Sequence, residues 1–258
     1  MKIAVLIKQV PARDAEITIN ADESWIDEDG IEFATSEPDD YALEAALQIK
    51  EAQGGEVVAM SLGPKRVQDA LRTALAKGAD RAVHITDAHG HGLDPLQVAG
   101  ALAGAAGAES FDLIVSGLQS DDYGYGQTGV LLAELLGLPH ATVVVDIDAG
   151  PDKLRIKREL EEGWAQSVEL PLPAVLTIQS GINKPRYTSF KGIMAARKKE
   201  IREVPSQEVM PTDMAAGMEI LRIYAPEDTG AAEMLEGGAA EQAAALLEKL
   251  KYQARVLQ

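Results

Sequence analysis

Short runs of apolar, mostly β-branched residues alternate with longer alanine- and leucine-rich stretches through the first half of the chain. The apolar runs occupy residues 3–7, 57–62, 81–85 and 113–116, and the stretches with helical spacing occupy residues 40–53, 65–77 and 95–108. Strands that are apolar at nearly every position are typical of a sheet covered on both faces. The alternation therefore predicts an α/β fold, with a mostly parallel sheet and helices on both of its faces.

An acidic stretch, EITINADESWIDEDGIEF, interrupts this pattern between the first strand and the first helix. Its alternating segments flank the turn sequence DEDG, which predicts a hairpin insertion over about residues 14–34. After Pro139 the pattern changes to extended segments at residues 142–146, 154–159, 166–170 and 174–178, without long helices between them. These segments predict additional strands in a mixed or antiparallel arrangement.

The chain from residue 204 onward has a looser pattern. It contains a polar stretch, a strand-like segment at residues 219–224, a turn at Gly237 and Gly238, and a helical pattern at residues 241–251. Its apolar content is too low for a core of its own. We expect an α/β nucleotide-binding domain over residues 1–203 and a C-terminal arm over residues 204–258 that packs on a partner subunit. The alternative is an arm that folds back on its own domain.

Composition narrows the classes of function. The chain has no cysteine, which excludes disulfides, thiolate catalysis and cysteine-ligated clusters, so any redox role requires a bound cofactor. A net charge of −17 disfavours a general nucleic-acid surface. No apolar run approaches the roughly 20 residues that span a bilayer. The start, MKIAVLIKQV, is better explained as a strand than as a secretory signal, which leads us to expect a cytoplasmic protein.

Three loops follow predicted strands, at the strand ends where open α/β sheets bind their ligands. They are residues 6–9, residues 61–64 and the sequence GLQSDDYGYGQTG at residues 117–129. The third loop leads into a helical pattern, so the backbone N–H groups of residues 126–129 are placed to hold a phosphate. A tight strand-to-helix turn capped by Thr128 is the structural alternative. The loop lacks the lysine of a Walker A motif.

Two groups of polar residues invite a catalytic or metal interpretation. Asp121 and Asp122 resemble an acid/base pair or magnesium ligands, although adjacent carboxylates in such a loop are more often turn formers and solvated charges. The residues Asp87, His89, His91 and Asp94 resemble a metal cluster, but a polar loop before a helix explains them more simply. We assign no catalytic residue and no metal.

The segment at residues 181–202 is basic against an acidic background. Between Lys184 and Arg202, basic residues outnumber acidic ones by seven to one. Phe190, Ile193 and Met194 have the spacing of one helical face. The segment is either a core helix with a solvated charged face or a protruding anchor, with apolar side chains for a partner's pocket and charges at its rim.

Six segments together resemble the beta subunits of electron-transfer flavoproteins, in the order and spacing of that family. They are VLIKQV, DDYALEAALQIKE, SLGPKRVQDALRTALAKGADRAV, GLQSDDYGYGQTG, IKRELEEGWAQSVELPLPAVLT and GINKPRYTSFKGIM. The fifth resembles the family signature, with Glu162 where glycine or aspartate is usual. The resemblance implies a Rossmann-like fold of the adenine-nucleotide alpha-hydrolase type and an electron carrier without catalytic turnover of its own.

The resemblance also implies cofactors and partners. This subunit would hold a structural AMP, and an alpha subunit would complete the heterodimer and hold most of the FAD. Electrons would enter from a dehydrogenase and leave to a quinone reductase or another acceptor. The implied cofactor-binding residues are Leu6, Lys8, Ser36, Glu37, Pro38, Asp39, Leu62, Gly63, Asp121, Asp122, Tyr123, Gly124, Tyr125, Gly126, Gln127 and Thr128, with Arg13 near the flavin. The implied recognition residues are Phe190, at the position of an exposed leucine in the family, and Lys191, Ile193, Met194 and Arg197.

The sequence departs from the common AMP-type members at two places. Residues 36–39 replace an Asn-Pro-Phe-Cys-like stretch, and residues 125–128 replace an Asn-Gln-Thr-Gly ending. The chain looks closer to AMP-binding members that serve trimethylamine-type dehydrogenases. One alternative is a bifurcating subunit with a second FAD in place of AMP, although its usual Thr-Ala-Gln-Val-Gly-Pro-like loop ending is missing. The other is a stand-alone adenine-nucleotide-binding regulatory module.

Overall fold

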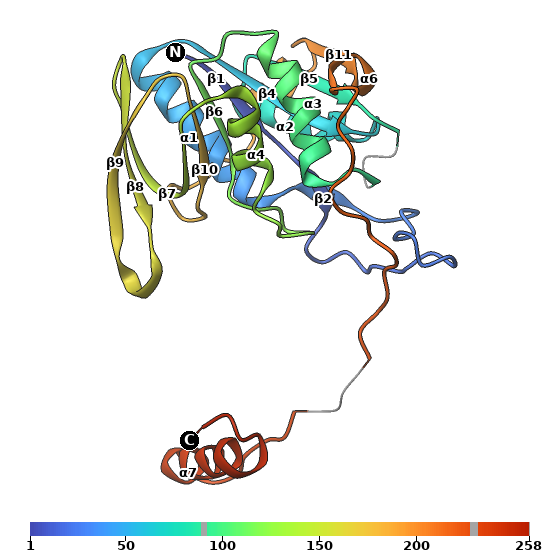
Figure 1. Cartoon of the computed structure of the whole chain (residues 1–258), viewed down its shortest axis with the longest axis vertical. Helices are drawn as coiled ribbons and strands as arrows, with labels where there is room; N and C mark the ends of the chain where they lie inside the picture. Colours follow the sequence, from blue (N-terminus) through green and yellow to red (C-terminus); the bar gives the residue numbers. More distant parts are fainter. Residues whose placement is uncertain (89–91, 228–231, 258) are drawn as a thin grey trace. The chain divides into compact units, whose positions relative to one another are not determined.

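The computed structural model describes residues 1–88, 92–227 and 232–257, and the chain forms two compact units, Met1–Ile223 and Tyr224–Gln258 (Figure 1). The first unit extends past the predicted domain end at residue 203. That position lies inside a strand, β11 (Ile201–Pro205), which pairs with β5 (Arg81–Thr86) at the edge of the main sheet. A short helix, α6 (Ser206–Val209), follows and packs on α3 (Pro95–Gly107).

In the described part of the first unit, the main sheet has nine strands in the order β11-β5-β4-β1-β6-β10-β7-β8-β9. The remaining strands of this sheet are β1 (Lys2–Leu6), β4 (Glu56–Gly63), β6 (Leu113–Gly117), β7 (His140–Ala149), β8 (Lys153–Glu159), β9 (Ala165–Pro171) and β10 (Ala174–Ile178). Neighbours are parallel from β11 to β7, and β7, β8 and β9 are antiparallel. This arrangement confirms the predicted fold class, including the additional antiparallel strands. Sequence order did not reveal that β10 enters the sheet between β6 and β7.

Helices cover both faces of the parallel part of the sheet. The alternation of side chains along β1 separates two cores: Ile3 and Val5 face α1 (Glu37–Gln53) and α2 (Val67–Lys77), whereas Ala4 and Leu6 face α3 and α4 (Thr128–Leu136). Figure 1 shows the long helices flanking the strands. Burial on both faces explains why the strands of this region have near-continuous apolar sequences.

The acidic insertion forms a hairpin, but the tip of this hairpin does not lie at the predicted position. A short antiparallel pair, β2 (Gln9–Pro11) with β3 (Phe33–Thr35), closes its base, and a single antiparallel bridge joins Ile19 to Ile26. DEDG forms a turn, closed by a hydrogen bond from the N–H of Ile31 to the carbonyl oxygen of Glu28 (3.3 Å), but the tip of the hairpin lies at residues 20–25. The reason is the Asn20 side chain, whose Oδ1 accepts hydrogen bonds from the backbone N–H groups of Ser24 and Trp25.

The strand predicted beyond α6 is absent from the described residues. Residues 219–224 have no regular secondary structure, since no described strand pairs with them, and apolar alternation alone does not form a strand without a partner. The second unit contains α7 (Ala239–Glu248), continued by a π-helical turn, η3 (Lys249–Gln253), close to the predicted helix. No side chain of α7 is buried. Within the described ranges, no helix combines the length and apolar character needed to cross a membrane.

Candidate functional site

A cavity of about 150 Å³ opens beside the carboxyl ends of β1, β4 and β6. After β1 the chain builds β4 and β5 on one side and then crosses to β6 on the other, so the cavity lies where the strand order reverses. Open α/β sheets bind ligands at this point. The structure brings together these predicted residues in its lining: Leu6, Lys8, Asp39, Leu62, Tyr123, Tyr125, Gly126, Gln127 and Thr128. The predicted residues that do not line it are Arg13, Ser36, Glu37, Pro38, Gly63, Asp121, Asp122 and Gly124.

Asp39 fixes the shape of this cavity through its carboxylate. Helix α1 begins three residues before the predicted start, which places Asp39 in its first turn. Its Oδ2 atom accepts a hydrogen bond from the backbone N–H of Lys8 (2.8 Å), and its Oδ1 atom accepts one from the N–H of Gly117 (2.8 Å). Burial raises the pKa of Asp39 to about 7 against the opposing effect of these two hydrogen bonds. One buried carboxyl thus ties α1 to the ends of both β1 and β6.

Only glycine fits at position 117 beside this carboxyl. A Cβ atom there would lie 2.6 Å from the Cβ of Pro38 and 2.7 Å from Oδ1 of Asp39. The close approach of α1 to the end of β6 therefore depends on a residue without a side chain.

The two adjacent carboxylates of the loop after β6 hold this loop to the rest of the domain. Asp121 Oδ2 accepts a hydrogen bond from the backbone N–H of Glu37 (2.6 Å), and the N–H of Asp121 donates to Ser36 Oγ (3.1 Å). Asp122 forms an ion pair with Lys8, with 2.7 Å between Oδ2 and Nζ. Each carboxylate is engaged with a different structural partner, which favours the turn and ion-pair interpretation over an acid/base pair.

Aromatic side chains pack along the outer part of the same loop. Tyr123 and Tyr125 are stacked, with ring centroids 5.2 Å apart and planes 6° apart, and the ring of Trp25 lies 6.0 Å from that of Tyr123. Lys8 Nζ lies 4.5 Å from the Tyr123 centroid. Burial raises the pKa of the Tyr123 hydroxyl, which has no hydrogen-bond partner among the described residues. Sequence reasoning missed Trp25, since nothing in the local pattern pairs it with a residue almost 100 positions away.

The cavity has a polar end at the start of α4. The N-cap residue is Gln127 rather than Thr128, and its side chain makes no capping hydrogen bond. Ser116, which is buried and lines the cavity, has a hydroxyl without a hydrogen-bond partner among the described residues. A Cβ on Gly129 would lie 3.0 Å from this hydroxyl oxygen. Free helix amides beside an unpaired buried hydroxyl form a site suited to an anion. Sequence reasoning missed Ser116, whose signal was its position at the end of β6.

The remaining polar candidates do not form a second site. Arg13 is exposed and paired with Glu37. Of the proposed metal cluster, His89 and His91 lie outside the described residues, Asp87 accepts a hydrogen bond from Ser206 Oγ, and Asp94 caps α3 through the N–H of Gln97. Over the ranges that the structure describes, no three histidine, cysteine or acidic residues gather as metal ligands.

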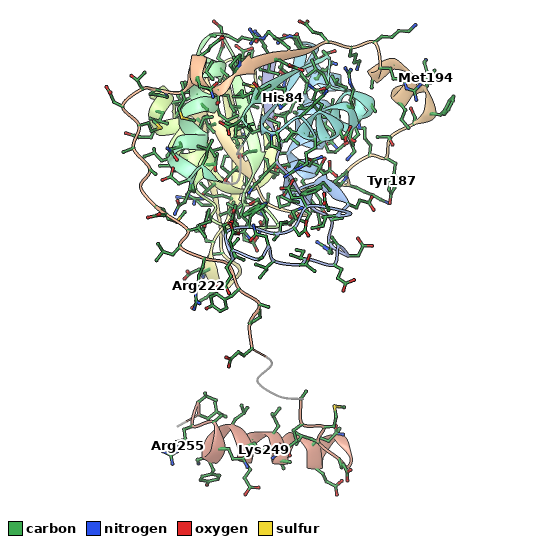
Figure 2. All side chains as sticks on the ribbon, turned by 90° about the vertical axis from the view of Figure 1, so that its right-hand side faces the viewer. His84, Tyr187, Met194, Arg222, Lys249 and Arg255 are labelled. Carbon is green, nitrogen blue, oxygen red and sulfur yellow. The ribbon has the colours of Figure 1, made fainter. Side chains whose placement is uncertain are left out.

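The basic segment presents an apolar surface to solvent. It forms a short helix, α5 (Phe190–Ala196), on which Phe190, Ile193 and Met194 are 81%, 42% and 47% exposed. Tyr187, which sequence reasoning did not select, is 92% exposed just before the helix. Figure 2 shows Tyr187 and Met194 on a segment that projects from the sheet. The core-helix alternative was therefore wrong, and we call Tyr187, Phe190, Ile193 and Met194 the exposed apolar face.

The fold and the cavity define a class of protein: an α/β domain with a mostly parallel, Rossmann-like sheet and a crevice at the reversal of strand order. Comparison with known proteins gives the family. The electron transfer flavoprotein domain matches residues 24–209. The chain is 43% identical over 257 residues to an electron transfer flavoprotein subunit beta from Methylophilus methylotrophus, covering 96% of this chain and 97% of that protein.

More distant relatives have the same name. The subunit beta of Mus musculus is 33% identical over 99% of both chains, and that of Mycobacterium bovis is 38% identical over 80% of both. The chain therefore belongs to the electron transfer flavoprotein family, among its beta subunits. Its role is in electron transfer by a flavoprotein.

Proposed function

We propose that this chain is the beta subunit of a heterodimeric electron-transfer flavoprotein that binds AMP in the crevice between β1 and β6. The alpha subunit holds most of the FAD, a dehydrogenase supplies the electrons, and a quinone reductase or another acceptor receives them. The observation that supports AMP is the crevice itself, which ends in the free amides of α4 and the unpaired Ser116 hydroxyl.

The residues of the crevice suit a single nucleotide. Leu6, Met60, Leu62 and Leu102 line its apolar part, as a purine base requires, and the first amides of α4 suit a phosphate. Because Asp39 engages both of its oxygens with backbone N–H groups, we assign it to the shape of the crevice rather than to the ligand.

The chain has no cysteine and therefore supplies no thiol redox group of its own. The FAD would accept and release the electrons. This chain would orient the alpha subunit and present a surface to the donor. Arg13, which is exposed just after β2, would be its side chain nearest the flavin.

The surface for the donor dehydrogenase is the exposed apolar face of α5. Lys191 and Arg197 flank it on a chain with a net charge of −17, so an apolar pocket with an acidic rim is the complementary partner surface.

The test is co-expression with the alpha partner, purification of the complex, release of the ligands with acid, and quantification of FAD and AMP by chromatography. One FAD and one AMP per heterodimer are expected. Two FAD and no AMP would indicate a bifurcating subunit. A monomer that binds nucleotide without a partner or flavin would indicate a regulatory module.

A further inference from the structure

Helix α5 is too short to be stable by itself. It has seven residues, and isolated helices below about 12–15 residues are marginal in water. Burial of its apolar side chains stabilises it little, because Ala196 is its only buried residue. The order of this helix must therefore come from contacts with the domain below it.

The C-terminal end of α5 is held by α2. Arg72 Nη1 donates hydrogen bonds to the carbonyl oxygens of Ala196 (2.6 Å) and Lys199 (2.8 Å). Lys199 Nζ in turn donates to the carbonyl of Leu75 (3.1 Å). The last carbonyls of a helix lack partners within the helix and attract positive charge, so a guanidinium stabilises this end.

The N-terminal approach to α5 is held by α1. Arg186 donates from Nε to Oε2 of Glu44 (2.7 Å) and from Nη2 to Oε1 (3.0 Å), and its Nη1 donates to Oε1 of Glu51 (2.5 Å). Glu44 is buried. The two parallel hydrogen bonds between the guanidinium and its carboxylate fix both the position and the orientation of the Arg186 side chain. Asn183 Nδ2 adds a hydrogen bond to the carbonyl of Tyr41 (3.0 Å).

The middle of α5 also lies against α2, since a Cβ on Gly192 would collide with the carbonyl oxygen of Ala76. The helix is thus fixed at both ends and at its centre, with none of these contacts made by the exposed apolar face. Rigid presentation of a binding surface reduces the entropy lost on association.

We propose that Arg72 and Arg186 are positioning residues, which clamp α5 to α2 and α1 so that its apolar face meets the partner dehydrogenase in one fixed arrangement. This inference rests on the proposed docking function. The clamp acts on the strength of docking and not on the flavin, because neither arginine lines the nucleotide crevice.

The first test is reduction of the flavin in the whole complex at increasing complex concentration, with the dehydrogenase as donor. Arg186→Met is expected to raise KM for the complex about tenfold, with kcat, FAD content and AMP content unchanged. Arg186→Lys is expected to raise KM less than Arg186→Met, because lysine keeps the positive charge although it cannot form the paired hydrogen bonds of a guanidinium. Lys77→Met is the matched control, since it removes a cation that joins α2 to α1 through Asp40 (2.6 Å) without contacting α5, and KM stays within about twofold of the wild type.

The second test separates positioning from a direct contact. In a Phe190→Ala background, Arg186→Met is expected to raise KM by clearly less than the roughly tenfold effect in the wild type, because the main anchor of the face that it positions is gone. Independent, full effects of the two changes would overturn the proposal.

Hydrogen exchange of the backbone N–H groups of Ile193 and Met194 gives a readout that does not require docking. Faster exchange in Arg186→Met, with the rest of the domain unchanged, supports the clamp, and unchanged exchange overturns it. Faster exchange with an unchanged KM overturns the docking role of the clamp. An unchanged KM in Phe190→Ala alone would instead contradict the proposed docking surface.

Discussion

The carboxylate of Asp39 accepts a hydrogen bond from the backbone N–H of Gly117 over 2.8 Å, which joins the first turn of α1 to the last residue of β6. The ligand crevice is therefore shaped from the helix side as well as by the strands. Because the carboxyl is buried, its ionisation is linked to the stability of the fold.

Asp39→Asn tests this link. Burial raises the pKa of Asp39 from 3.8 to about 7, so the native chain retains a proton that the unfolded chain releases at lower pH. The contribution of this carboxyl to stability is fully present below pH 4 and falls as the pH rises through 7. We expect the free energy of unfolding of the wild type, relative to the variant, to fall by on the order of 2 kcal/mol between pH 5 and pH 8. Urea denaturation at several pH values measures it, with Asp69→Asn, at an exposed carboxylate of α2, as the control, and a constant difference would contradict the expectation.

Glu109→Gln probes an ion-pair network at the opposite ends of the strands. Lys2, Arg81 and Arg202 each lie within 2.9 Å of its carboxylate oxygens, and hydrogen bonding to Arg81 is the main reason that its pKa falls from 4.5 to about 2. This stabilisation is present above pH 4.5 and is lost as the pH falls through 2. The variant should lose about 1–3 kcal/mol at pH 7 and much less near pH 3. Chemical denaturation at these two pH values distinguishes this from a loss that does not depend on pH.

Gly129→Ala adds a methyl group where there is no space. Its Cβ would lie 2.5 Å from Cγ2 of Thr177 and 3.0 Å from Oγ of Ser116, which must displace the start of α4. We expect a loss of about 1–3 kcal/mol in stability and reduced AMP in the purified complex. Gly107→Ala is the control, because its Cβ meets only the side chain of Leu136 at 3.9 Å, an ordinary contact. Full AMP content in Gly129→Ala would argue against a phosphate at this helix end.

Phe190→Ala removes the largest side chain that α5 contributes to the exposed apolar face. Its 81% exposure means that folding, flavin content and AMP content stay unchanged. Stopped-flow measurement should show a loss of about tenfold or more in the second-order rate of flavin reduction by the donor. Leu221→Ala, at an 87% exposed apolar residue away from α5, should leave this rate unaltered. Equal rates for Phe190→Ala and the wild type would reject the docking role.

The sequence predicted the features that depend on local periodicity or on general rules of sheet architecture. The parallel strands and long helices were predicted from apolar spacing. The crevice was predicted from the rule that open α/β sheets bind ligands at the strand ends, and Lys8, Leu62 and Thr128 do line it. The apolar face of α5 was also predicted from spacing.

Contacts between distant segments could not be predicted in this way. Three such contacts depend on tertiary placement. They are the packing of Trp25 on Tyr123, the hydrogen bonds that Asp39 accepts from two backbone N–H groups, and the hydrogen bond from Arg72 to the carbonyl of Ala196. The tip of the hairpin in the insertion was misplaced because the side chain of Asn20, and not the turn at DEDG, closes it. The segment at residues 219–224 was taken for a strand because its pattern does not show whether a neighbouring strand is available.

The residues that attach α5 to the domain differ from the residues that α5 exposes to solvent. The clamp uses carbonyl oxygens of the helix and side chains outside its apolar face, so substitutions at Tyr187, Phe190, Ile193 and Met194 leave the anchoring contacts intact. Under the proposed docking role, a change of electron donor requires the exchange of only these four outward-facing side chains, while the sheet and the crevice stay as they are. The same four positions can therefore be substituted without altering the hydrogen bonds that hold α5 to the domain.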